Sequence, residues 1–235
     1  MATIVPAILP SSRVDLESKL AALHGITTDV QIDIVDGRFA LPPTWPYITE
    51  GEAPQEDQFA RHSTLNFEID LMVKEPELVI GSWITLGASR ITVHAESTQY
   101  LARLVDDFAA RYGYEKDFLP GMLSLGLAIN LSTDLALIEP YMDRIDYVQF
   151  MGIRRIGVQG EPFDSDVLRK IALFRKKYPT IPVEVDGGVS LASAPDLLKA
   201  GVSRLVVGSA LWKAPNVAHE YKKFTELVEE YGIYE

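Results

Sequence analysis

The feature that most constrains the fold is an alternation of short apolar runs with longer amphipathic stretches, repeated eight times along the chain. The short runs are rich in β-branched residues, as strands are, and the longer stretches carry apolar residues at helical spacing. Strands that are apolar on both faces are typical of a parallel sheet covered by helices. The predicted strands are residues 3–9, 29–35, 66–72, 90–94, 124–130, 147–151, 182–186 and 204–207.

Eight such units are enough to close a barrel, so the predicted fold is α/β, a single (β/α)8 (TIM) barrel. Its 235 residues fit one barrel domain spanning 1–235. A doubly wound open sheet is the alternative, but no G-x-G-x-x-G follows the first strand. The predicted helices are 13–23, 54–61, 75–85, 98–112, 134–141, 164–177, 193–200 and 216–231.

Composition excludes several classes of partner and site. A formal charge of -11 opposes nucleic acids and anionic membranes, so neither is expected as a partner. Because the chain has no cysteine, a metal must be held by oxygen or imidazole ligands. The start lacks a secretory signal, and no apolar run approaches the ~18 residues of a membrane span. We therefore expect a soluble, cytoplasmic protein.

Polar side chains near the ends of predicted strands suggest a site. In a βα barrel the carboxyl ends of the strands meet around one pocket. Asp33, Asp70 and Asp186 each lie in an otherwise apolar strand, where an unpaired carboxylate costs several kcal/mol. One buried aspartate is usually structural, whereas three on three strands indicate a functional site. His94 also ends a predicted strand, and this position fits either a site residue or a hydrogen-bonded core histidine.

Glycines after the last two predicted strands suggest a phosphate site. Gly187 and Gly188 follow one strand, and Gly208 and Ser209 follow the next; exposed backbone N–H groups there, before a helix or short turn, form an anion cradle. In the preceding loop, GIRRIGVQGEPFD, Gly157 and Gly160 allow closure over a ligand. Its two arginines, Arg154 and Arg155, either contact the ligand anion or are solvated.

The motifs PAIL, DIVDGRF, DLMVKEPE, VHAES, GEPFD, EVDGGV and VVGSALW together resemble the ribulose-phosphate 3-epimerase family over nearly the whole chain. The resemblance implies a metal-dependent barrel in which two aspartates exchange a proton with a sugar phosphate through an enediolate. It places Asp33 and Asp186 in those catalytic roles and gives Asp36 a mainly structural one. It also implies a possible homo-oligomer and predicts that the residues contacting substrate are Ala7, Met72, His94 and Met151.

The chain departs from the family at four positions. Gln31 and Asp70 stand where the family has two metal-binding histidines, Ala7 replaces a serine, and Val35 replaces a methionine. The implied metal ligands, Gln31, Asp33, Asp70 and Asp186, then offer only oxygen atoms. Such a set favours a hard ion, Mg²⁺, Mn²⁺ or Ca²⁺, over zinc. If no metal binds, repulsion should leave at least one carboxyl protonated at neutral pH.

Three functions follow from these residues. The first is a divergent, metal-assisted pentose-phosphate epimerase or isomerase. The second is a catalytically silent barrel that binds a sugar phosphate, favoured by Ala7, Gln31 and Asp70. The third is another sugar-phosphate enzyme of the superfamily. Related enzymes carry a D-x-K-x-x-D pattern, but the segment 33–36 lacks its lysine.

Overall fold

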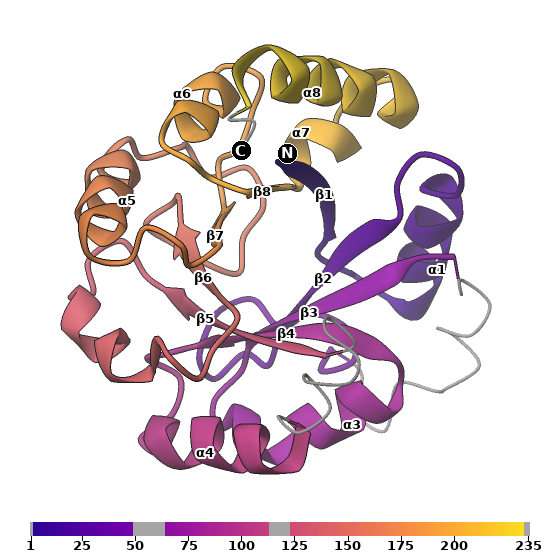
Figure 1. Ribbon diagram of the computed structural model, residues 1–235. Helices are drawn as coiled ribbons and strands as arrows, with labels where there is room; N and C mark the ends of the chain where they lie inside the picture. Colours follow the sequence, from indigo (N-terminus) through magenta and orange to yellow (C-terminus); the bar gives the residue numbers. More distant parts are fainter. Residues whose placement is uncertain (1, 49–63, 113–122, 233–235) are drawn as a thin grey trace.

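Eight parallel strands close into a barrel in the computed structural model, which describes residues 2–48, 64–112 and 123–232. Each strand pairs with its sequence neighbours, and β1 pairs with β8 to complete the ring (Figure 1). The predicted (β/α)8 barrel is therefore confirmed. The strands are β1 (Thr3–Ile8), β2 (Asp29–Val35), β3 (Asn66–Met72), β4 (Ala88–His94), β5 (Ser124–Ile129), β6 (Tyr147–Met151), β7 (Val183–Asp186) and β8 (Arg204–Val207).

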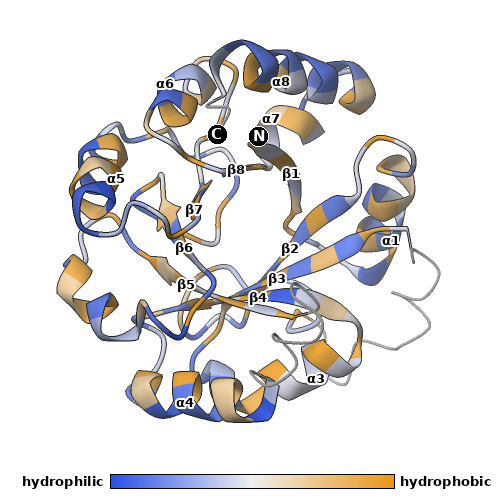
Figure 2. Ribbon diagram, in the orientation of Figure 1, coloured by the Kyte–Doolittle hydropathy of each residue, from blue (hydrophilic) through white to orange (hydrophobic). Residues whose placement is uncertain are grey.

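Helices surround the barrel and turn their apolar sides to it (Figure 2). In α4, for example, Leu101, Leu104, Val105 and Phe108 are buried, which is the spacing of one helix face. The α-helices among the described residues are α1 (Arg13–Ala22), α3 (Ile80–Thr85), α4 (Leu101–Tyr112), α5 (Asp166–Lys177), α6 (Ala194–Lys199), α7 (Ser209–Trp212) and α8 (Val217–Tyr231). None of the helices in this part of the chain is long and apolar enough to cross a membrane.

Two predicted helices differ from the structure. Residues 134–141 form two 3₁₀ turns, η3 (Leu135–Leu137) and η4 (Glu139–Tyr141), because Pro140 has no N–H to continue an α-helix. Residues 75–85 divide into the 3₁₀ turn η1 (Pro76–Leu78) and α3, since Val79 between them has a non-helical φ of -120°; Glu75, before the turn, is left-handed with φ 60°. The helix predicted at 54–61 lies outside the described residues.

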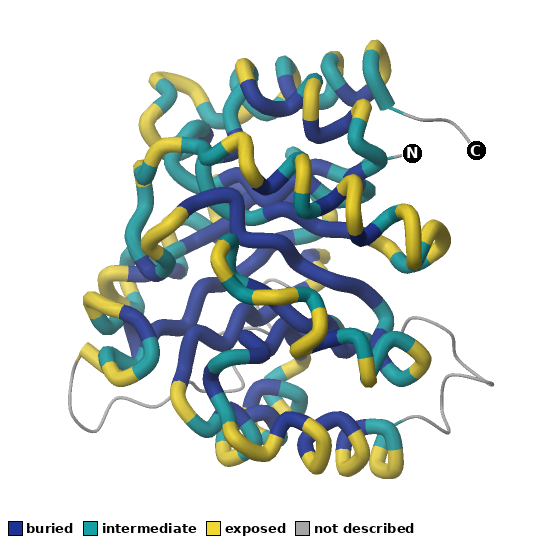
Figure 3. Tube along the Cα trace, turned by 90° about the vertical axis from the view of Figure 1, so that its left-hand side faces the viewer, coloured by how far each residue is buried: buried dark blue, intermediate teal, exposed yellow. Residues whose placement is uncertain are grey.

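Side chains alternate between the barrel interior and the layer beneath the helices. In β2, Val30, Ile32 and Ile34 join the outer apolar core, while Gln31 and Asp33 lie on the interior side. The strands are buried on both faces, as the dark blue centre of Figure 3 shows. Polar residues on these strands therefore meet inside the barrel rather than in solvent.

The interior is filled at its amino-terminal end by an ion-pair network. Arg90 contacts Glu68 and Glu184, both at 3.0 Å, and Arg204 contacts Glu68 at 3.0 Å. The Arg90 guanidinium also lies 3.8 Å from the centre of the Tyr147 ring. Because this plug closes one end, a small molecule has access to the interior only from the carboxyl ends of the strands.

Candidate active site

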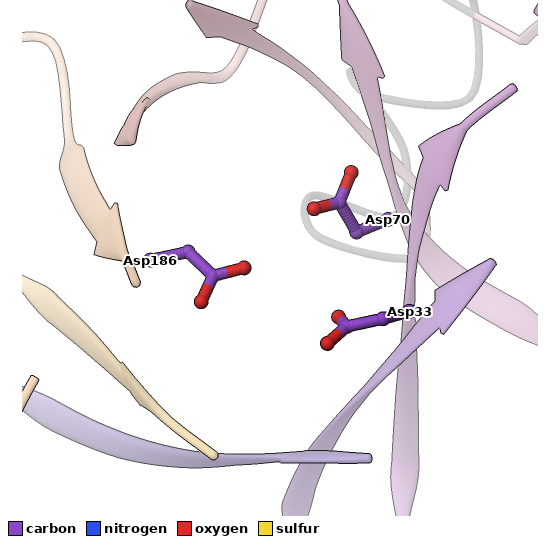
Figure 4. A group of neighbouring side chains, drawn as sticks. All are labelled: Asp33, Asp70 and Asp186. Atoms are coloured by element: carbon purple, nitrogen blue, oxygen red, sulfur yellow. The ribbon is translucent and has the colours of Figure 1, made fainter. Parts of the chain in front are cut away.

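Three aspartates converge at the carboxyl ends of β2, β3 and β7. Asp33 and Asp70 are register partners on adjacent strands, and Asp186 points toward them from β7 (Figure 4). One carboxylate oxygen from each lies within 4.8 Å of the others. Parallel strands bring these residues together although 153 positions separate Asp33 from Asp186 (186 − 33).

Burial and mutual repulsion make these carboxyls hard to ionise. Burial, together with the charge of Asp70, raises the pKa of Asp33 to about 8. Burial and the charges of Asp33 and Asp70 raise the pKa of Asp186 well above its ordinary value. At neutral pH, and without a bound cation, the cluster therefore retains at least one proton.

Gln31 lies between two of the aspartates. Its Nε2 donates to Asp33 Oδ1 at 2.7 Å and to Asp186 Oδ2 at 2.9 Å. The side chain is fully buried, and its Oε1 has no hydrogen-bond partner among the described residues. The amide thus stabilises two carboxylates while leaving one buried acceptor free.

Asp70 is contacted by two further buried side chains, His94 on β4 and Gln149 on β6. His94 Nε2 lies 3.2 Å from Asp70 Oδ1, and Gln149 Nε2 donates to Asp70 Oδ2 at 3.0 Å. Burial lowers the pKa of His94, but the Asp70 carboxylate more than offsets this, so the pKa is raised. Gln149 was not predicted, although a glutamine within the apolar run YVQFM is the same kind of signal that identified Asp33.

The donor atoms present fit a hard divalent cation. Three carboxylates converge, and a rotation of the Gln31 amide that exchanges Oε1 with Nε2 adds a fourth oxygen facing them. That rotation also gives the unpartnered Oε1 a positive partner. Carboxylate and amide oxygens are the ligands preferred by Mg²⁺, Mn²⁺ and Ca²⁺. The cluster can therefore hold such an ion.

The glycines after β7 and β8 border the aspartates. Gly187 and Gly188 have φ values of 99° and 69°, which side chains rarely adopt. A Cβ on Gly188 would lie 2.5 Å from the Phe163 backbone, so no larger residue fits there. Ser209 begins α7, which has only four residues, so any anion here is bound by local N–H groups rather than by the dipole of a long helix.

A cavity of about 50 Å³ connects Asp33 and Asp186 with these glycines. Most of the residues predicted to bind metal, phosphate or substrate line it, namely Ala7, Asp33, Met72, Met151, Gly157, Gly160, Asp186, Gly187, Gly188, Gly208 and Ser209. Gln31, Asp70 and His94 do not line it. The His94 ring is buried beside Asp70, with its centre 5.4 Å from that of the Phe39 ring. Direct contact of His94 with substrate stays a prediction; the contact that the structure gives is the one with Asp70.

The loop between β6 and α5 also borders the cavity. Val158, Gln159 and Glu161 line it, and none of them was predicted, although they lie between or next to the glycines Gly157 and Gly160 that identified the loop. Arg154 contacts Asp164 at 2.6 Å, and Arg155 contacts Glu161 at 2.5 Å. Both arginines are largely solvent exposed, so of the two interpretations of the pair, the structure shows the solvated one.

The fold and the position of the site define a (β/α)8 barrel protein whose polar centre lies at the carboxyl ends of the strands. The chain belongs to the ribulose-phosphate 3 epimerase family, whose sequence model matches residues 3–212. The family membership indicated by the motifs is therefore confirmed.

Two relatives illustrate this similarity in sequence. Ribulose-phosphate 3-epimerase of Schizosaccharomyces pombe is 30% identical, with 91% of this chain and 88% of the relative covered. Ribulose-phosphate 3-epimerase of Bacillus subtilis is 29% identical, covering 90% and 93%. Both are carbohydrate epimerases, the enzyme class expected from the sequence.

Two similar solved structures agree in fold at lower identity. KGPDC from Streptococcus mutans superposes with a TM-score of 0.73 at 14% identity, covering 98% of both chains. The 3-hexulose-6-phosphate synthase of Salmonella typhimurium gives 0.71 at 14% identity, covering 97% and 99%. At this identity the likeness establishes the barrel and its topology alone.

Proposed function

We propose that this protein is a ribulose-phosphate 3-epimerase that works with a hard divalent cation. The observation that carries the proposal is the arrangement of Asp33 and Asp186, which face each other at the barrel mouth with the glycine cradle beside them. Inversion at a carbon needs a base on one side and an acid on the other. Two carboxyls on facing strands supply that pair.

In the proposed reaction Asp33 and Asp186 exchange one proton with the substrate carbon next to the carbonyl. One carboxylate removes the proton, which leaves an enediolate, and the opposite carboxyl returns a proton to the other face. Because burial raises the pKa of Asp33 to about 8 and that of Asp186 well above its ordinary value, the pair keeps a proton at neutral pH and so supplies the acid. A bound divalent cation would favour the charged form of the other carboxyl, which would then be the base.

We assign the cation to Gln31, Asp33, Asp70 and Asp186. When bound, a divalent cation acts as a Lewis acid that stabilises the negative charge on the substrate oxygens. His94 and Gln149 orient Asp70 by contacting its two oxygens. These two residues support the ligand set in the way that hydrogen-bonded neighbours commonly orient metal-binding side chains.

We assign the phosphate of the ligand to the glycine side of the cavity and its sugar to the side of Ala7, Met72 and Met151. Gly187, Gly188, Gly208 and Ser209 present backbone N–H groups, and Gly157 and Gly160 bring the loop between β6 and α5 close to them. The ligand then spans the cavity from the cradle to the aspartates.

The test follows deuterium entry at C3 of D-ribulose 5-phosphate by NMR in D₂O, with Mg²⁺, Mn²⁺ or Ca²⁺ and with EDTA. We expect exchange in the presence of one of these ions and its loss in Asp33→Asn. Asp29→Asn is the matched control, because Asp29 lies on the same strand at the opposite end of the barrel, near Arg204. Exchange that is absent under all conditions, or equal in wild type and Asp33→Asn, contradicts the proposal.

One observation favours a second function, a barrel that binds a sugar phosphate without turnover. Gln31 Nε2 donates to both proposed catalytic carboxylates and so stabilises them without a cation. Calorimetric binding of D-ribulose 5-phosphate in EDTA, combined with no exchange under any ion, would favour this function over the epimerase.

A further inference from the structure

We propose that the side-chain amide of Gln159 binds the phosphate group of the ligand and closes the glycine cradle from the loop between β6 and α5. The inference deepens the proposed function, since it rests on a ligand that carries a phosphate. It adds to the backbone cradle a side chain that the sequence analysis did not single out.

Gln159 has a buried donor without an acceptor. Its Nε2 is inaccessible to solvent and makes no hydrogen bond to any residue that the structure describes. A buried amide donor without a hydrogen bond costs about 1–3 kcal/mol. The folding of the chain alone does not explain why the Gln159 amide occupies so unfavourable a position. A ligand oxygen in the cavity would remove that cost.

The donor lies over the cradle. A Cβ placed on Gly208 would be 2.9 Å from Gln159 Nε2, so the amide reaches the β8 end only because residue 208 has no side chain. Gln159 and Gly208 both line the cavity, together with Gly188 and Ser209. The amide and the backbone of the cradle therefore border the same space.

The groups around this space are suited to an anion. Within the described ranges, the backbone N–H groups of Gly188, Gly208 and Ser209 donate to no other group. Of the carboxylates that line the cavity, Asp33 and Asp186 accept from Gln31, and Glu161 Oε1 is paired with Arg155 at 2.5 Å. Several unpaired donors facing one space indicate a multivalent acceptor such as a phosphate.

Backbone hydrogen bonds hold the loop at its base, whereas none is made by the backbone of the segment 157–160 within the described part of the chain. Asp164 N donates to Gly152 O at 2.8 Å, and Gly152 N donates to Asp186 O at 2.6 Å. At the tip, Gly157 and Gly160 have φ values of 80° and 88°. The cavity of about 50 Å³ is small beside the roughly 300 Å³ or more of usual ligand sites. We infer that the segment 157–160 moves outward to admit the ligand and returns with Gln159 Nε2 donating to a phosphate oxygen.

The test measures binding of inorganic phosphate and of D-ribulose 5-phosphate by titration calorimetry in EDTA. Gln159→Glu keeps the shape but replaces the donor with a carboxylate, and Gln159→Ala removes it. We expect both variants to bind either probe more weakly, by about 10-fold for Gln159→Ala and by more for Gln159→Glu. Gln99→Glu is the matched control, because Gln99 is exposed and does not line the cavity; we expect a change of less than about 3-fold.

A thermal melt without ligand separates binding from folding, and the melting temperatures of wild type and both Gln159 variants should agree within a few degrees. Unchanged affinity for both probes in both variants, or no phosphate binding by wild type, would overturn the inference. Its failure is distinct from that of the proposed function: absence of C3 exchange with intact, Gln159-dependent phosphate binding contradicts the epimerase alone.

Discussion

Asp33 and Asp186 accept hydrogen bonds from one nitrogen atom, the Nε2 of Gln31, at 2.7 and 2.9 Å. The amide therefore occupies a position between two carboxylates where a cation would also be favourable. In the proposed ion-bound state the amide must turn its oxygen inward, since Nε2 carries positively polarised hydrogens. Gln31 is thus a donor to the cluster without the ion and, in the proposal, a ligand with it.

Removing this amide should make stability depend on the cation. In EDTA, Gln31→Leu leaves both carboxylates without their shared donor, and we expect the free energy of unfolding to fall by about 2 kcal/mol. Urea denaturation with and without Mg²⁺ measures this effect. Mg²⁺ should raise the stability of the variant, because Asp33, Asp70 and Asp186 remain to bind it. Equal stability of wild type and variant in EDTA would contradict the role of the amide.

Asp36 should be structural. Its Oδ1 accepts from the backbone N–H groups of Arg38 and Phe39, and its Oδ2 accepts from Lys74 N at 2.8 Å. In Asp36→Asn the remaining oxygen can still accept either from Arg38 and Phe39 or from Lys74, but the new NH₂ group then faces an N–H donor at the other position. We expect a loss of about 1–2 kcal/mol in urea denaturation.

Asp134→Asn is the matched control for Asp36→Asn. Asp134 Oδ1 accepts from Ala136 N at 2.8 Å, and an asparagine oxygen can make the same bond. The control should lose less than about 0.5 kcal/mol. A loss as large as that of Asp36→Asn would show that charge, rather than the three-bond geometry, determines the cost.

Gly126 should not tolerate alanine. A Cβ at this position would lie 2.1 Å from the Tyr147 ring, which is fully buried and stacked on Arg90. Because neither the ring nor the strand has room to move, we expect Gly126→Ala to lose about 3 kcal/mol or more in urea denaturation. Gly81→Ala has nothing within 4 Å and lies in α3, so it should be neutral or stabilising. Similar effects for the two substitutions would contradict the packing argument.

The raised pKa of Glu184 should make the free energy of unfolding fall as the pH rises. Burial and the charge of Glu68 raise its pKa from an ordinary 4.5 to about 8, although Arg90 and Arg204 act in the opposite direction. The folded protein then keeps a proton that the unfolded chain releases, so the free energy of unfolding falls between about pH 4.5 and pH 8. The slope from this one group is at most roughly 1.4 kcal/mol per pH unit.

Glu184→Gln tests this pH dependence, because glutamine does not ionise. The difference in unfolding free energy between variant and wild type, measured in urea at several pH values, should move in favour of the variant as pH rises. A difference that stays constant from pH 5 to pH 8 would contradict the raised pKa.

The barrel could be predicted from the sequence because its signal is local. The bounds of β2, β3, β6 and β8 agree with the predicted strands, since each apolar run is bounded by turn residues. The helix predicted at 134–141 was wrong, because Pro140 interrupts it. The prediction followed the helical spacing of the apolar residues and gave this local effect too little weight.

The alternation of elements, the family, and the strands that end in carboxylates and glycines can all be established from the chain alone. How those residues meet depends on the closed barrel: Gln31 joins Asp33 to Asp186, His94 contacts Asp70, and Gln159 reaches Gly208. The difference is one of range. Backbone and burial preferences act over a few residues, whereas side-chain contacts between β2 and β7, or between a loop and β8, exist only after the barrel has closed.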